Sequence, residues 1–261
     1  MIRVGPAGLG GVKEAENRLE SFKKLGLNAC EIAFTYGIYI KEKDAKRIGK
    51  KAKELDIKLS IHAPYWINLN SKEKEKVEKS KERILNCLKI GNLLNVELVV
   101  FHPGYYSGMD KEKCFQNIKK QVLEIEDERK RLGIKTKLAA ETTGKINVFG
   151  SMEEILRLKK ETKIDFCIDF AHIKAREQNR ITYKEIVERF PGKMHCHFSG
   201  IEFGEKGEKR HKETTEEEIK ELVKALPKDR EITIINESPS PTKDSVKALK
   251  ILREQNRISS L

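Results

Sequence analysis

The sequence has no long hydrophobic run. No stretch approaches the roughly 18 consecutive apolar residues that a membrane-spanning helix needs. The N-terminus also lacks the charged leader, apolar run and small-residue cleavage site of a secretory signal. We therefore expect a cytoplasmic protein with no membrane partner.

Cysteine is too scattered for a disulfide framework or a zinc cluster. The chain has five cysteines, an odd number at wide spacing, and three of them lie inside apolar runs that look like strands. We expect all of them to be buried free thiols. They are Cys30, Cys87, Cys114, Cys167 and Cys196.

Acidic residues are fewer than basic ones, and glutamine is scarce. Lysine plus arginine number 53 against 41 for aspartate plus glutamate, a net charge of +12. Such a surplus favours a polyanionic partner such as nucleic acid. A surface rich in lysine and glutamate but poor in glutamine is also typical of thermophile proteins. Charge alone leaves both interpretations open.

An alternation of short apolar runs and longer charged helical stretches repeats eight times along the chain. Alternating strands and helices indicate parallel pairing, and the length of 261 residues matches the roughly 250 of one α/β barrel. We predict the α/β class and a single (β/α)₈ TIM-barrel domain over residues 1–261. The expected strands are Ile2–Val4, Ala29–Phe34, Lys58–His62, Glu97–His102, Lys137–Glu141, Asp165–Asp169, Lys193–Phe198 and Glu231–Asn236.

A doubly wound open sheet is the alternative fold. It is disfavoured because Gly8, Gly10 and Gly11 do not form the G-x-G-x-x-G turn expected after its first strand. Ser71, Ser151 and Thr215 are expected to cap helix N-termini, and glycines at 26 and 133 to follow helix C-termini.

All six histidines fall at or just beyond the ends of predicted strands, together with three carboxylates. In barrel enzymes this C-terminal rim carries the active site. Imidazole and carboxylate together suit zinc, manganese or iron, whereas magnesium and calcium prefer oxygen alone. The set is too large for one tetrahedral ion, so two or three ions are implied, and a two-metal site suits phosphoester hydrolysis. The residues are His62, His102, Glu141, Asp169, His172, His195, His197, His211 and Glu237.

Two of these histidines share the seventh predicted strand. In MHCHF, His195 and His197 point to the same side at different depths. We expect His195 to be the ligand and His197 a supporting group. A lone histidine on a strand is usually a packing residue, and only the group as a whole favours ligation.

Six segments, in family order between Ala29 and Pro239, resemble the endonuclease IV family of abasic-site endonucleases. They are SIHAPYWINLN, VVFHPG, AAETTG, CIDFAH, KMHCH and IINESP. The resemblance implies one ion on His62, His102 and Glu141, and a second on Glu141, Asp169, His195 and Glu237. It implies a third ion on His172 and His211, and zinc as the metal, with manganese as an alternative.

The chain departs from the family pattern in the seventh loop. The family's D-R-H is EKRH here, which puts Lys209 where a ligand aspartate is expected. Glu208, one residue away, is the available substitute. The third ion would then be held more weakly or be absent.

The resemblance also implies an activity. The enzyme would hydrolyse the phosphodiester 5′ to an abasic site in double-stranded DNA, leaving a 3′-hydroxyl and a 5′-deoxyribose phosphate, with Glu141 and Glu237 as catalytic residues. Tyr65 and Trp66 resemble the family's DNA-inserting loop. A monomer is expected. Further DNA contacts are predicted for Tyr36, Lys206, Lys209 and Arg210.

Two other functions remain open from the sequence. A sugar isomerase or epimerase of the xylose-isomerase-like barrels would share the architecture and a two-metal site, but would have less need of a basic rim. A non-catalytic protein would use metals for stability and its basic charge to bind nucleic acid.

Overall fold

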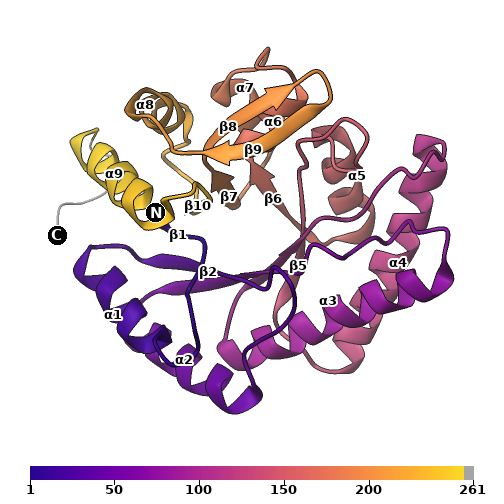
Figure 1. Ribbon diagram of the computed structural model, residues 1–261, viewed down its shortest axis with the longest axis horizontal. Coiled ribbons are helices and arrows are strands. Elements are labelled where there is room, and N and C mark those ends of the chain that lie inside the picture. Colours follow the sequence, from indigo (N-terminus) through magenta and orange to yellow (C-terminus); the bar gives the residue numbers. More distant parts are fainter. Residues whose placement is uncertain (256–261) are drawn as a thin grey trace.

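Eight parallel strands form the centre of the structure, a computed structural model that describes residues 1–255. Their order in the sheet is β1-β10-β7-β6-β5-β4-β3-β2, and the helices lie around the outside (Figure 1). The (β/α)₈ fold class predicted from the sequence is therefore confirmed. The strands are β1 (Ile2–Pro6), β2 (Ala29–Ala33), β3 (Lys58–His62), β4 (Leu98–Phe101), β5 (Lys137–Glu141), β6 (Asp165–Asp169), β7 (Met194–Phe198) and β10 (Ile232–Asn236).

The two edge strands, β1 and β2, meet closely enough to surround a common interior. The amide of Asn28 donates to the carbonyl of Val4 at 3.1 Å, and that of Gly8 donates to the carbonyl of Glu31 at 2.8 Å. A Cβ at Gly5 would lie 1.6 Å from the carbonyl oxygen of Ala29. Only glycine at position 5 therefore lets these two strands approach.

The helices begin and end largely where local chemistry predicts. Ser151 and Thr215 each form a capping box, and the glycines at 26 and 133 adopt the left-handed φ values of 80° and 66°. The cap predicted at Ser71 is wrong, because the helix starts at Lys74 and the Ser71 hydroxyl accepts from the amide of Glu73 instead. The helices are α1 (Ala15–Lys24), α2 (Glu42–Glu54), α3 (Lys74–Leu94), α4 (Lys111–Arg131), α5 (Met152–Thr162), α6 (Phe170–Arg176), α7 (Tyr183–Arg189), α8 (Glu216–Ala225) and α9 (Pro241–Glu254).

The two faces of the strands have different environments. The main apolar core includes Ile32, Val99 and Ile168 together with residues of the surrounding helices. The opposite strand faces carry many polar side chains into the interior, where the buried apolar cluster comprises Leu98, Val100, Ala139 and Cys167. The five cysteines are free and buried, as predicted. Burying so many polar groups inside the barrel requires partners for them, and these partners define the site.

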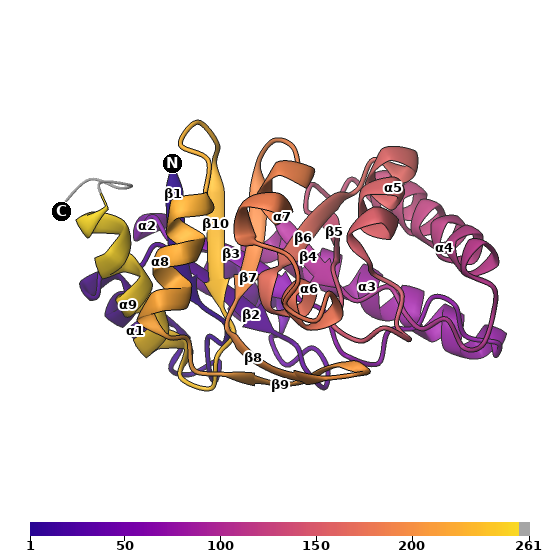
Figure 2. The same ribbon diagram turned by 90° about the horizontal axis from the view of Figure 1, so that it is seen from above.

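A hairpin that the sequence did not predict crosses one end of the barrel. Its strands, β8 (Gly200–Gly204) and β9 (Gly207–Lys212), are antiparallel and follow β7 (Figure 2). The hairpin packs on the segment after β5, where the amide of Glu208 donates to the carbonyl of Gly144 at 3.1 Å. Its charged sequence has no clear apolar alternation, so it resembled a loop. Among the described helices, none is long and apolar enough to cross a membrane.

Candidate metal centre

Strand register sets the depth of each candidate ligand. Asp169 at the end of β6 pairs with His197 on β7, whereas Cys167, two residues earlier, pairs with His195. Glu141 on β5 pairs with Cys167. His197 therefore lies level with Asp169 near the C-terminal rim, and His195 lies one layer deeper.

Glu141 lies at the centre of the candidate ligands and is fully buried. Its Oε2 lies 3.0 Å from the Nε2 atoms of both His62 and His102. Its Oε1 lies 3.2 Å from the Nδ1 atoms of both His172 and His197. Each oxygen of this carboxylate thus faces a different pair of imidazoles, as a carboxylate bridging two ions would.

Three groups of side chains bring potential ligand atoms within 4.8 Å of one another around this carboxylate. The groups share members, so one continuous centre results. They are His62–His102–Glu141, Glu141–Asp169–His197–Glu237, and Asp169–His172–His211.

Several buried polar atoms in this centre have close neighbours but no hydrogen bond. Nε2 of His102 lies 3.0 Å from Glu141, yet the contact lacks hydrogen-bond geometry. Oδ2 of Asp169 lies 3.5 Å from Nδ1 of His172, also without a hydrogen bond. Buried polar atoms in folded proteins almost always have partners. Their convergence, together with the mixed imidazole and carboxylate chemistry, fits a divalent ion such as zinc or manganese.

The electrostatics of the cluster lead to the same conclusion. Burial acts to raise the pKa of Glu141, but the charges of His102 and His197 hold that pKa well below its usual range. Burial acts to lower the pKa of His62, but its hydrogen bond to Glu141 raises the pKa to about 9. Protonated imidazoles therefore balance the buried carboxylates, and divalent cations would replace those protons.

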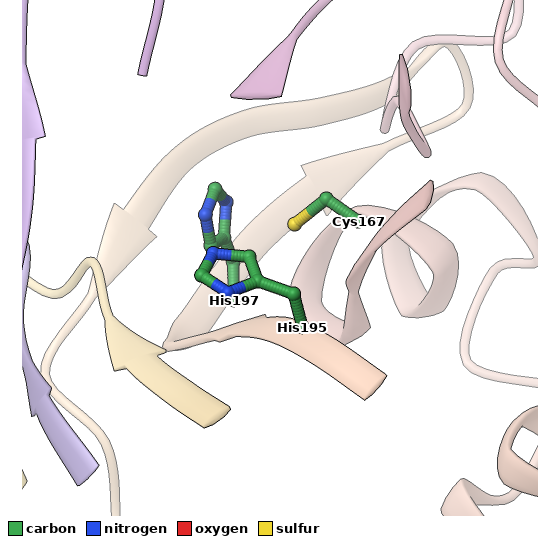
Figure 3. A group of neighbouring side chains, drawn as sticks. All are labelled: Cys167, His195 and His197. Atoms are coloured by element: carbon green, nitrogen blue, oxygen red, sulfur yellow. The ribbon is translucent and has the colours of Figure 1, made fainter. Parts of the chain in front are cut away.

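The structure brings the other histidine of β7, rather than the expected His195, next to the candidate carboxylates. His197, not His195, groups with Glu141, Asp169 and Glu237, and its Nδ1 lies 3.6 Å from Oε1 of Glu237. Nε2 of His195 lies 3.1 Å from Oε2 of Glu31. His195 also lies near Cys167 and His197 in a deeper layer, where Figure 3 shows the Cys167 sulfur pointing toward the two imidazoles.

Glu31 is a buried carboxylate that the sequence analysis missed. It lies on β2 with no exposed surface, and Oε1 lies 2.9 Å from Nε2 of His197. Ser60 donates a hydrogen bond to Oε2 at 2.7 Å. The available signal was a single charge inside the apolar run ACEIAF, which has no structural reason to be buried unless it is paired.

The hairpin brings Glu208 to the third group. Its Oε2 lies 3.4 Å from Nε2 of His172. Nε2 of His211 lies 3.3 Å from that nitrogen of His172. In a regular strand, residues three apart point to opposite faces. Phe203 pairs with Glu208 and Glu202 pairs with Arg210, so Lys209 is the extra residue of a bulge. The bulge lets Glu208 and His211 both face His172, while Lys209 remains exposed.

A cavity of about 260 Å³ opens above these ligands. Tyr65 lies over them, with its ring centroid 5.8 Å from that of His62. Trp66 and Tyr36 are 59% and 83% exposed, and their rings are 6.5 Å apart. The cavity is lined by His62, Tyr65, Ile67, His102, Gly104, Tyr105, Thr143, Gly144, Lys145, Val148, His172, Glu208, His211 and Glu237.

The expected DNA-contacting cations lie on the hairpin. Lys206, Lys209 and Arg210 are all exposed. Nε of Arg210 donates to Glu202 at 2.8 Å, so its charge is partly matched within the protein. Among the residues that the structure describes, Lys206 and Lys209 form no ion pair, so they are the more available cations.

Residues 19–255 match the family model described as xylose isomerase-like TIM barrel. The chain belongs to this family. An uncharacterized protein of Methanocaldococcus jannaschii is 40% identical over 270 residues, covering 97% of this chain and 98% of that protein. A probable endonuclease 4 of Aquifex aeolicus is 30% identical over 145 residues. That match covers 54% of this chain and 51% of the relative, so the chain spans about half the length of this endonuclease.

Solved structures place this xylose isomerase-like barrel among proteins of different named activities. SacUVDE has a TM-score of 0.76 at 20% identity, over 95% of this chain and 88% of its own. Endonuclease IV from Thermus thermophilus has a TM-score of 0.69 at 21% identity, and the match covers 97% of this chain and 98% of that one. A D-psicose 3-epimerase has a TM-score of 0.67 at 17% identity, and the match covers 92% of each chain. At such identities the likeness establishes the fold alone.

Proposed function

We propose that this protein is a metal-dependent DNA-repair endonuclease that hydrolyses the phosphodiester 5′ to abasic sites. The observation that carries the proposal is Glu141, whose two oxygens face separate pairs of imidazoles at 3.0 and 3.2 Å. A carboxylate between two ions suits a displacement at phosphorus, where the attacking and leaving oxygens are stabilised together. The relationship to a probable endonuclease 4 supports the same chemistry.

Two or three divalent ions, zinc before manganese, would be held by the three ligand groups of the centre. When bound, such ions polarise the phosphate and lower the pKa of water enough to supply hydroxide near neutral pH. Glu141 sets the spacing between the ligand groups. Glu237 is the partly exposed carboxylate at the cavity wall, so it is placed to orient the attacking water.

The substrate would enter as an extrahelical sugar. Flipping a nucleotide is least costly where there is no base to unstack. Tyr65 lines the cavity, and the exposed rings of its neighbour Trp66 and of Tyr36 contact each other. These rings can fill the gap left in the duplex. Breaking the bond between phosphorus and the 3′-oxygen leaves a 3′-hydroxyl and a 5′-deoxyribose phosphate.

The test is a nicking assay with metal-replete protein and a duplex that carries one abasic analogue. We expect a single cut on the 5′ side of the lesion and no cut in the matched intact duplex. Glu141→Gln should still bind the abasic duplex but fail to cut it. Unchanged cutting by this variant, or no cutting by the wild-type protein, would refute the proposal.

The rival function is a sugar epimerase, favoured by the fold neighbour D-psicose 3-epimerase. A cavity of about 260 Å³ is large enough for a monosaccharide. The same protein preparation should therefore be offered a ketose. Turnover of the ketose with an intact abasic duplex would support the epimerase instead.

A further inference from the structure

Glu31 lies inside the barrel and pairs with both inward histidines of β7. It projects from β2, while its two imidazole partners project from β7. Oε1 lies 2.9 Å from Nε2 of His197, and Oε2 lies 3.1 Å from Nε2 of His195. Each oxygen of this carboxylate thus approaches a different histidine.

His197 has one ring nitrogen on each side of this arrangement. Nδ1 faces the centre, 3.2 Å from Oε1 of Glu141. Nε2 lies 2.9 Å from Oε1 of Glu31, a charge contact that lacks hydrogen-bond geometry. A histidine that ligates a metal through one nitrogen usually gives its other N–H to a carboxylate or carbonyl. That partner fixes the tautomer and orientation of the ring and makes the ligating nitrogen more basic.

We infer that Glu31 is a positioning residue that anchors His197 as a metal ligand. The inference rests on the metal-binding part of the proposed function. Glu31 is not a member of any of the three groups of candidate ligands. It pairs with one member of them, His197. Its negative charge, rather than its bulk, is what makes Nδ1 of His197 a good ligand.

His195 and Ser60 complete the anchor from below. Ser60 donates to Oε2 of Glu31 at 2.7 Å, and His195 approaches the same oxygen. A buried carboxylate without such partners would be costly, so these two residues offset the cost of burying Glu31. This role explains why β7 carries two inward histidines although only the upper one reaches Glu141.

The test compares the metal affinities of Glu31→Gln and the wild-type protein by chelator competition. Glu31→Gln keeps the shape of the side chain and removes its charge. We expect the affinity for one ion to fall about 10- to 100-fold, as for other carboxylates that support a ligating histidine. The thermal midpoint of the metal-free protein is measured alongside, because a purely structural role would lower that midpoint without a selective loss of affinity.

Glu126→Gln is the matched control. Glu126 is also a buried carboxylate, but it pairs with Arg129 on α4 at 2.8 Å. This variant should keep wild-type metal affinity. Equal affinities for Glu31→Gln and Glu126→Gln would overturn the inference.

Two further variants keep the inference testable if Glu31→Gln does not fold. His195→Asn should weaken one ion modestly while the number of ions per chain stays the same. Loss of a whole ion in His195→Asn or Cys167→Ser would overturn the inference, because His197 would then ligate a deeper ion with Cys167 and His195 (Figure 3). Nicking by the wild-type protein is scored separately, so failure of the proposed nuclease and failure of this anchor remain distinguishable.

Discussion

Oε2 of Glu141 lies 3.0 Å from Nε2 of His62, while Oε1 of the same carboxylate faces the imidazoles of His172 and His197. One side chain therefore belongs to two groups of ligands. Its position at the end of β5 places it beside the ends of both β4 and β6. Changes at this residue should affect more than one ion.

Glu141→Gln should lower the metal content by more than one site. An amide oxygen can still ligate weakly, but a neutral amide cannot offset the charge of two cations. We therefore expect the nicking rate to fall by at least about 100-fold. Metal analysis of the purified variant and a nicking assay check this. His102→Gln is the comparison, because it removes a ligand from one group only. If Glu141→Gln lost no more metal than His102→Gln, the bridging role would be excluded.

The third group should depend on Glu208 and not on Lys209. Glu208→Gln removes the carboxylate that faces His172, so the most weakly held ion should be lost first on titration with a chelator. Lys209→Ala changes an exposed neighbour in the same bulge and should leave metal content unchanged. Lys209→Asp adds a further carboxylate and tests whether the bulge can present it. A loss of metal in Lys209→Ala equal to that in Glu208→Gln would contradict the assignment.

The strands, and the meeting of polar side chains at one end of them, were predictable because both depend on local sequence. Several apolar runs end in a polar side chain such as His62, Glu141 or Asp169, and parallel strands bring such ends to one rim. The relative depth of His195 and His197 was not predictable. It depends on the stagger between β6 and β7, which pairs Asp169 with His197.

Long-range pairing explains the other omissions. Glu31 and His195 are 164 residues apart in sequence, so no local pattern joins them. The approach of Glu208 to His172 depends on a bulge at Lys209, which changes the face on which the side chain lies. Comparison with the family's D-R-H pattern suggested Glu208 as a substitute ligand, which stays a prediction, but the local sequence could not reveal the bulge.

Stability should depend on pH in opposite directions without and with metal. Without metal, the folded-state pKa of His62 is about 9, above its ordinary value of 6.5. The stabilisation from its protonated form is complete below about pH 6.5 and is lost as the pH rises through about 9. With metal, the imidazoles must be unprotonated, so stability should instead fall as the pH drops below about 6.5.

Thermal unfolding of chelator-treated and zinc-loaded protein at about pH 6 and about pH 9 checks this prediction. The metal-free protein should be more stable at the lower pH and the loaded protein at the higher pH. His62→Gln should flatten the metal-free profile. Parallel profiles for the two forms would show that these histidines do not bind the ions.

The hairpin cations should contribute unequally to DNA binding. Lys206 and Lys209 are exposed, whereas Arg210 already donates to Glu202. Lys209→Ala should weaken binding to any duplex and reduce the slope of log affinity against log salt by about one. Arg210→Ala should change the slope less, because it also frees Glu202. Equal slopes for wild-type and Lys209→Ala protein would remove the hairpin from the DNA interface.

Trp66 should contribute to lesion binding and little to folding. It is 59% exposed, and its described ring contact is with Tyr36, which is 83% exposed, so Trp66→Ala should leave the free energy of unfolding almost unchanged. If its ring fills the gap at an abasic site, truncation should cost about 1–3 kcal/mol of binding, as aromatic stacking on a base does. Fluorescence anisotropy with abasic and intact duplexes measures this. Trp66→Phe keeps an aromatic ring and should retain most of the preference, because the effect comes from stacking. Equal loss of affinity for both duplexes in Trp66→Ala would mean that Trp66 contacts DNA without sensing the missing base.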